Sequence, residues 1–174
     1  MACQTAPQIM LDENMLVENQ PRAYSRAIMT SNKQPHREAD RSSGYVAETA
    51  GIRVAVRSFF LADQSRPDQQ HFIWAYRVRI ENRSNLAVQL LARTWRITDA
   101  RGAVQIVHGD GVIGEQPVLD PGESFEYTSG TPLKTPSGFM TGHYHMIVAD
   151  SGEKFDVAIP PFSLDSPFDL HQLH

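Results

Sequence analysis

The stretch that decides the fold is Phe72-Ile-Trp-Ala-Tyr-Arg-Val-Arg-Ile-Glu81. Every second side chain in it, from Phe72 through Trp74 to Ile80, is large and apolar, and the alternate positions become charged towards its end. An apolar period of two residues is the pattern of a β-strand that buries one face and exposes the other. The stretch therefore predicts a half-buried β-strand.

Stretches of the same character predict six more strands, at 52–61, 88–98, 104–108, 123–129, 143–149 and 154–159. Turn residues such as Asp120-Pro121-Gly122 separate them, and short connections make antiparallel neighbours. About seven short strands, each with one apolar face, are buried best as two packed sheets. The sequence thus predicts an all-β fold, a fibronectin type III-like or immunoglobulin-like β-sandwich, with a closed barrel as the alternative.

Within 88–98 the apolar residues change parity, since Val88 and Leu90 share one parity and Trp95 and Ile97 the other. A β-bulge near 90–92 reconciles the two halves of this strand. We expect Trp95 in the core, together with an aromatic set that alternates with polar residues: Phe125, Tyr127, Phe155 and Phe162.

Composition excludes several classes of protein. The 174 residues are 41% hydrophobic and 21% charged, which suits one soluble globular domain. A net charge of -4 disfavours nucleic acid as the main partner, and no apolar run approaches the ~20 residues of a membrane span. The single cysteine, Cys3, excludes an internal disulfide, and no secretory signal is recognisable at the start. These features predict a cytoplasmic protein without membrane insertion.

The chain divides into three parts. Residues 1–44 lack a sustained apolar period and are expected to form a disordered N-terminal extension, with a short helix at 9–20 as an alternative. Residues 45–170 form the predicted β-domain, and 171–174 are a C-terminal tail.

A glycine-rich loop follows the strand predicted at 104–108. The run from His108 through Gly109 and Gly111 to Gly114 satisfies G-x-G-x-x-G, in which glycines let backbone amides curl around a phosphate. No helix pattern follows, so a dinucleotide-binding fold is rejected, and no Lys-Ser or Lys-Thr follows to make a P-loop. The preferred interpretation is a tight loop between sheet elements, and the alternative is a phosphate cradle.

Two arginines, Arg93 and Arg96, flank Trp95 and could contact an anion or a partner, although both are expected on the surface. His143 and His145 would share one strand face, which is half of a metal site, and surface histidines are the preferred interpretation. No nucleophile elbow, HExxH or paired Cys/His arrangement occurs. The sequence predicts no catalytic residues, no metal site and no cofactor.

Longer motifs carry a family resemblance. They are QLLARTW at 89–95, GDGVIGEQP at 109–117, PGESFEYTSG at 121–130 and FDVAIPPFSL at 155–164. Over about residues 45–167 the chain closely resembles the bacterial ApaG family, also called CorD. One departure is Thr94, which stands where many members have histidine.

The resemblance implies a fibronectin type III-like sandwich, a link to cobalt resistance and magnesium efflux, and recognition rather than catalysis. The family's glycine loop as a pyrophosphate-binding motif would carry over to His108, Gly109, Gly111, Gly114, Gln116 and Pro117.

We therefore expect a non-catalytic binding module in Co²⁺/Mg²⁺ homeostasis that recognises pyrophosphate or a nucleoside polyphosphate through this loop. The alternative is a protein–protein interaction adaptor that pairs a sheet edge or a loop with another chain. A third, less favoured hypothesis is a weak nucleotide hydrolase that uses Asp110 or Glu115 with magnesium.

Overall fold

The strand that carries the deciding stretch, β4 (Phe72–Asn82), lies in the middle of a five-stranded sheet in the computed structural model, which describes residues 10–11 and 44–169. This sheet, called sheet one, has the order β1 (Met10–Leu11), β8 (Ser124–Leu133), β4, β3 (Ile52–Phe60) and β2 (Tyr45–Thr49). All its pairs are antiparallel except β1 with β8.

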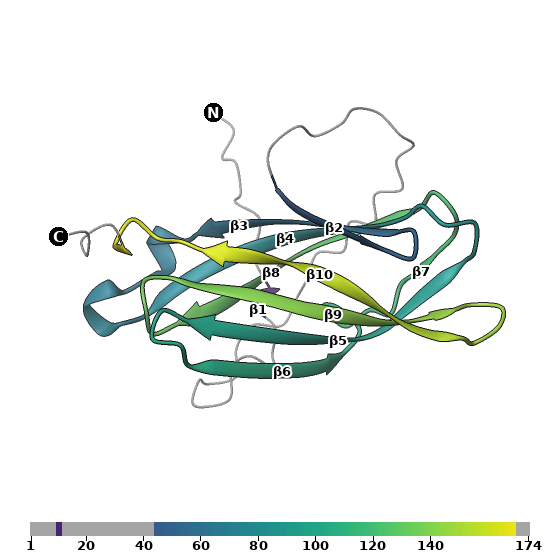
Figure 1. Ribbon diagram of the computed structural model, residues 1–174. Coiled ribbons are helices and arrows are strands. Elements are labelled where there is room, and N and C mark those ends of the chain that lie inside the picture. The colour runs from purple at the N-terminus through teal and green to yellow at the C-terminus, as the bar shows by residue number, and fades with distance from the viewer. Residues whose placement is uncertain (1–9, 12–43, 170–174) are drawn as a thin grey trace, which may run out of the picture.

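Sheet two has the order β10 (Lys154–Leu164), β9 (Gly138–Val148), β5 (Val88–Asp99) and β6 (Val104–Asp110), all antiparallel. The short β7 (Val118–Leu119) pairs with the start of β5. The sheets form two layers, with β6 at the lower border in Figure 1. The predicted β-sandwich is confirmed, and the closed barrel is wrong.

All seven predicted strands are present, and the described residues add the short strands β1, β2 and β7. Residues 10–11 pair with Ser129 and Gly130 as a strand, so the helix suggested at 9–20 is wrong at those two positions. Residues 1–9 and 12–43 of the predicted extension and the tail at 171–174 lie outside the described residues. The described helices are two 3₁₀ turns, η2 (Ala62–Gln64) and η3 (Pro67–Gln69). Across this part of the chain, no helix has the length and apolar character that crossing a membrane requires.

The strands at the C-terminal end are longer than predicted. β10 continues through Pro160 and Pro161 because its register against β9 shifts between Ile159 and Phe162, which accommodates residues that cannot donate to the ladder. β9 begins at Gly138 and passes close to β5 at Gly142, where a Cβ would collide with the Thr94 carbonyl oxygen. The bulge predicted in β5 is confirmed by a register shift between Leu90 and Ala92.

The core is centred on Trp95 of β5, whose side chain is 0% exposed. The centroid of its ring lies 5.4 Å from that of Tyr76 in sheet one and 5.9 Å from that of Phe162 on β10. Both pairs are edge-to-face, an arrangement that aromatic rings favour. Tyr127 is also buried, whereas Phe125 and Phe155 pack against the core from half-buried positions. The core placement predicted for Trp95, Tyr127 and Phe162 is confirmed.

A tyrosine pair also joins the two sheets. The hydroxyls of Tyr127 on β8 and Tyr144 on β9 are hydrogen-bonded at 2.6 Å inside the core. Burial is the main cause that raises the pKa of both hydroxyls well above the ordinary tyrosine value, since a buried phenolate would lose its hydration. Both groups therefore remain neutral and hydrogen-bonded at physiological pH.

We expect Trp95→Ala to lower the free energy of unfolding by ~3–5 kcal/mol, because it removes the ring that bridges the two sheets and leaves a cavity. Chemical denaturation measures this loss. Phe139→Ala is the control, since Phe139 is 42% exposed. A loss below ~1 kcal/mol for Trp95→Ala would contradict its placement at the centre of the core.

Candidate functional site

The glycine-rich loop leaves β6 at Asp110 and forms a tight turn. The Gly111 amide donates to the Leu91 carbonyl at 2.8 Å, and Val112 and Glu115 exchange two backbone hydrogen bonds of 2.8 and 2.9 Å. The turn between them has positive φ at both central residues, 45° at Ile113 and 79° at Gly114. Two successive positive φ values are typical of a type I′ hairpin turn.

Arg93 lies beneath this loop. Its side chain points into the sandwich and the residue is 4% exposed, so the expectation that Arg93 lies on the surface is wrong. Its Nη1 donates to the carbonyls of Asp110 at 3.0 Å and Gly111 at 2.7 Å. A buried guanidinium is stable when such acceptors surround it, and here it ties the loop to β5 from the inside.

The predicted phosphate-loop residues lie together, but most of their donors are engaged. The amides of Gly111, Val112 and Glu115 bond to carbonyls, and Gln116 Nε2 donates to the Leu91 carbonyl at 2.7 Å. Gly109 is buried in the β6 ladder opposite Arg93.

Of the predicted contacts, His108 and Arg96 are exposed. Arg96 points away from the core on sheet two and donates only weakly to Thr98 Oγ1, at 3.5 Å. The two predicted arginines thus face opposite sides of β5.

A line of hydrogen-bonded side chains crosses the outer face of sheet two. Asp156 on β10 contacts His145 Nδ1 on β9 at 2.7 Å, and His145 Nε2 contacts Thr94 Oγ1 on β5 at 2.8 Å. The same Thr94 oxygen lies 2.7 Å from His108 Nδ1 on β6. We call these four residues the outer-face relay.

The sequence did not predict the outer-face relay as a unit. His143 and His145 were expected to share a face, and both point outward around the buried Tyr144. Their partners depend on strand register, which alternation alone does not determine. In the described part of the chain, no three or more His, Cys, Asp or Glu side chains are grouped closely enough to hold a metal ion.

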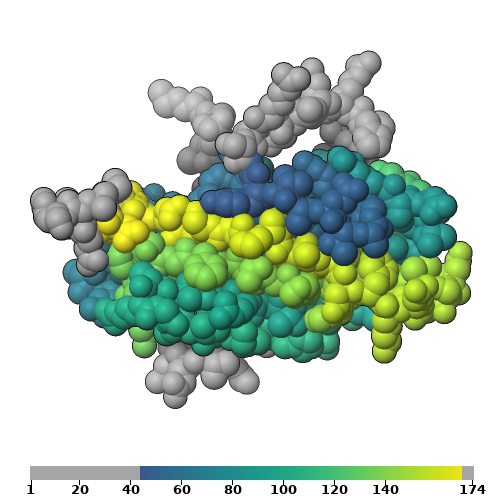
Figure 2. Space-filling model, viewed as in Figure 1, coloured from purple at the N-terminus to yellow at the C-terminus, as the bar shows by residue number. Residues whose placement is uncertain are grey.

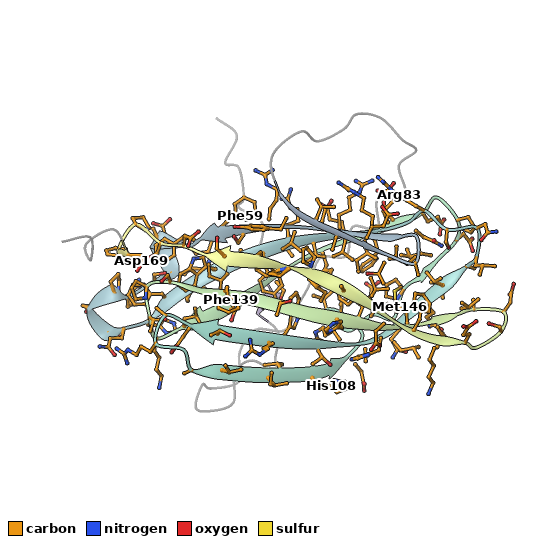
Figure 3. All side chains as sticks on the ribbon, viewed as in Figure 1. Phe59, Arg83, His108, Phe139, Met146 and Asp169 are labelled. Carbon is orange, nitrogen blue, oxygen red and sulfur yellow. The ribbon has the colours of Figure 1, made fainter. Side chains whose placement is uncertain are left out.

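Strand β6 forms one edge of sheet two and carries exposed apolar side chains. Val104 is 46% exposed and Ile106 59%, and no described strand pairs with the far side of β6. Phe139 on β9 adds a third exposed apolar side chain, opposite Thr98, which in turn pairs with Val104. We call β6 and these apolar side chains the β6 edge surface; Figure 3 labels His108 near its end.

A hollow of about 390 Å³ lies where β10 meets β2 and β3. Figure 2 shows β10 between β9 and these first strands of sheet one. The hydroxyls along it bond one another: Tyr45 Oη lies 2.7 Å from Ser163 Oγ, and Ser58 Oγ donates to the Ser163 carbonyl at 2.8 Å. These bonds join the edges of the two sheets instead of pointing towards a ligand.

Fold and site together define a class: a two-sheet antiparallel β-sandwich domain with a glycine-rich hairpin braced from inside by a buried arginine. The family model described as the ApaG domain matches residues 62–148. The chain belongs to the ApaG family.

Curated relatives and solved structures agree. Protein ApaG of Rhodospirillum centenum is 63% identical over 123 residues, covering 71% of this chain and 94% of the relative. Protein ApaG of Paramagnetospirillum magneticum is 58% identical over 130 residues, covering 75% and 99%. A crystal structure of a Bordetella pertussis protein described as ApaA matches with a TM-score of 0.65 and 43% identity, covering 72% of this chain and 98% of that one.

The geometry of this turn predicts that two glycine substitutions lower the free energy of unfolding by different amounts. Gly111→Ala places a Cβ against the Glu115 carbonyl oxygen at a φ of +57°, so we expect a loss of at least ~2 kcal/mol in stability. Gly114→Ala is the matched control, because its φ is also positive but no atom lies within 4 Å of the new Cβ, and about 1 kcal/mol is expected. Equal losses in thermal or chemical denaturation would contradict this turn geometry.

Proposed function

We propose that this ApaG-family protein is a non-catalytic binding domain of the cytoplasm that engages a protein partner through the β6 edge surface. An incoming extended segment would add a strand beside β6, and its side chains would cover Val104 and Ile106. Recognition by strand addition combines backbone hydrogen bonds with side-chain contacts at every second residue.

The observation that carries this proposal is the lack of protection on β6. Natural sheet edges are blunted by charges, prolines or short strands, because an open edge invites pairing with another chain. In the described residues, β10 has two prolines and Lys154, β2 has Glu48, and β1 is two residues long. From Val104 to His108, β6 has none of these features, and its one charged residue, Asp110, stands at the end of the strand.

The outer-face relay does not argue for catalysis. Its order of carboxylate, imidazole and hydroxyl is that of a hydrolase triad. However, the Thr94 hydroxyl is also bonded to His108, and it lies on a central strand that is paired on both sides. The backbone amides of such a strand are used in the ladders, so they do not form the oxyanion site that acyl transfer requires.

A second candidate is recognition of pyrophosphate or a nucleoside polyphosphate at the tip of the glycine loop, within Co²⁺/Mg²⁺ homeostasis. One observation favours it: the amides of Ile113 and Gly114 make no backbone hydrogen bond within the described residues, and His108 is exposed on the adjoining strand. Two amides and an imidazole are fewer donors than a phosphate cradle usually offers. The β6 edge surface therefore remains the preferred site.

Ile106→Lys tests the preferred site. The full-length protein is immobilised and used to capture partners from native extract, and the wild type is expected to retain one reproducible protein. Ile106→Lys is expected to reduce the recovery of that protein at least about tenfold, because a charged edge residue opposes strand addition. Stability should change by no more than about 0.5 kcal/mol, since Ile106 is exposed.

The matched control is Val46→Lys, which places the same charge on the edge strand β2 at a residue that is 48% exposed. Undiminished capture by Val46→Lys with loss in Ile106→Lys supports the β6 edge surface. Equal capture by Ile106→Lys and the wild type would rule this surface out.

The phosphate candidate is tested by an NMR titration of the labelled protein with pyrophosphate, then with Mg²⁺ and Co²⁺. If this candidate holds, saturable amide shifts are expected at Ile113 and Gly114, whose amides make no backbone hydrogen bond within the described residues. Unmoved amides from His108 to Glu115 at millimolar pyrophosphate would remove it.

A further inference from the structure

The outer-face relay ends at His108, which lies on the strand proposed to meet a partner. We propose that His108 is a specificity-determining residue of the β6 edge surface: the relay holds its outward Nε2 as a hydrogen-bond acceptor, and one added proton converts it to a donor. The recognition part of this inference rests on the proposed function, whereas the relay itself is a property of the free protein.

The direction of each bond follows from the donors and acceptors available. A carboxylate only accepts, so the contact between Asp156 and His145 Nδ1 requires a proton on that nitrogen. In a neutral His145 the other nitrogen, Nε2, is then a bare acceptor, and the Thr94 hydroxyl must donate its proton to it.

Thr94 has only one hydroxyl proton, so its remaining contact fixes His108. The Thr94 oxygen must accept from His108 Nδ1, which therefore carries a proton. A neutral His108 then has its lone pair on Nε2, the nitrogen that faces away from Thr94. This is the opposite tautomer to the one that an unconstrained neutral histidine prefers.

One additional proton reverses this pattern at the outward nitrogen. If His145 takes the proton, its Nε2 donates to Thr94, Thr94 donates to His108 Nδ1, and the His108 proton moves to Nε2. If His108 takes it, both of its nitrogens carry protons. In either case Nε2 becomes a donor, and histidine is the side chain that gains a proton between neutral and mildly acidic solution.

The charges around the relay come from all four strands of sheet two. Asp156 contacts His145 directly, and its carboxylate is the counter-charge nearest to an added proton. By strand alternation the same face also carries Lys154 on β10, His143 on β9, Arg96 on β5 and Asp110 on β6. These side chains include both positive and negative charges. What distinguishes His145 from His143 is the direct contact of His145 with Asp156.

This arrangement specifies the chemistry of the partner. In neutral solution the position beside His108 favours a group that only donates, such as a backbone amide or an ammonium group. The same donor meets a protonated nitrogen in mildly acidic solution and loses its bond. Binding through the β6 edge surface should therefore weaken as the solution becomes acidic.

The relay is tested by long-range ¹H–¹⁵N NMR of the imidazole rings in the full-length protein at about pH 8 and about pH 5. At the higher pH the wild type should show a protonated Nδ1 and an unprotonated Nε2 at His108. Thr94→Val removes the hydroxyl and should shift His108 towards the ordinary Nε2-protonated tautomer, whereas Thr94→Ser should retain the wild-type signals. An Nε2-protonated His108 in the wild type at about pH 8, or no change in Thr94→Val, would overturn the relay.

Recognition is tested with the partner whose capture is lost in Ile106→Lys. At about pH 8, Thr94→Val should bind that partner about five- to tenfold more weakly than Thr94→Ser, a difference of one hydrogen bond. Equal binding would overturn the role of His108 in recognition. If the wild type captures nothing, the proposed function fails, and the NMR result still decides separately whether the relay exists.

Discussion

Trp95 of β5 packs against Tyr76 of the opposite sheet and Phe162 of its own, and the facing of the candidate site residues on β5 follows from this contact. Trp95 fixes which side chains of β5 face inward, because successive residues of a strand alternate between its faces. Arg93 therefore points into the sandwich, where it binds the carbonyls of the glycine loop, and Thr94 points outward between two histidines. The inner face of β5 therefore has a structural role, whereas its outer face is turned towards solvent.

This separation changes how the glycine-rich motif is interpreted. Its G-x-G-x-x-G spacing suggests a phosphate cradle, yet in this fold Gly111 provides room beside the Glu115 carbonyl and Gly114 provides a positive φ in a two-residue turn. The buried guanidinium of Arg93 then neutralises carbonyl dipoles instead of meeting a ligand. The recognition surface that we propose is the outer side of sheet two, where β6 has an open edge in the described residues and the relay ends.

The sequence predicts the strands and the core well, because alternation reports directly on burial. Trp95, the bulge near Leu90 and the strand at β4 follow from that pattern alone. Strand register does not follow from alternation, so the hydrogen bonds of Thr94 with His108 and His145, which lie on three different strands, could not be predicted. Arg93 was misplaced because a charged side chain is buried only when carbonyls converge on it, and those carbonyls belong to a loop whose path is a tertiary property. The continuation of β10 through Pro160 and Pro161 was not predicted either. Prolines fit a hydrogen-bonded ladder here only because the register shifts, and that shift is also a tertiary property.

The central claim, that β6 is the recognition edge, is tested most directly by amide hydrogen exchange of the full-length protein with and without its captured partner. Binding should slow exchange of the β6 amides between Val104 and His108, because an added strand satisfies donors that otherwise face solvent. Exchange in β2 at the border of sheet one should not change. Protection confined to the glycine loop or to sheet one, with β6 exchanging as in the free protein, would contradict the account.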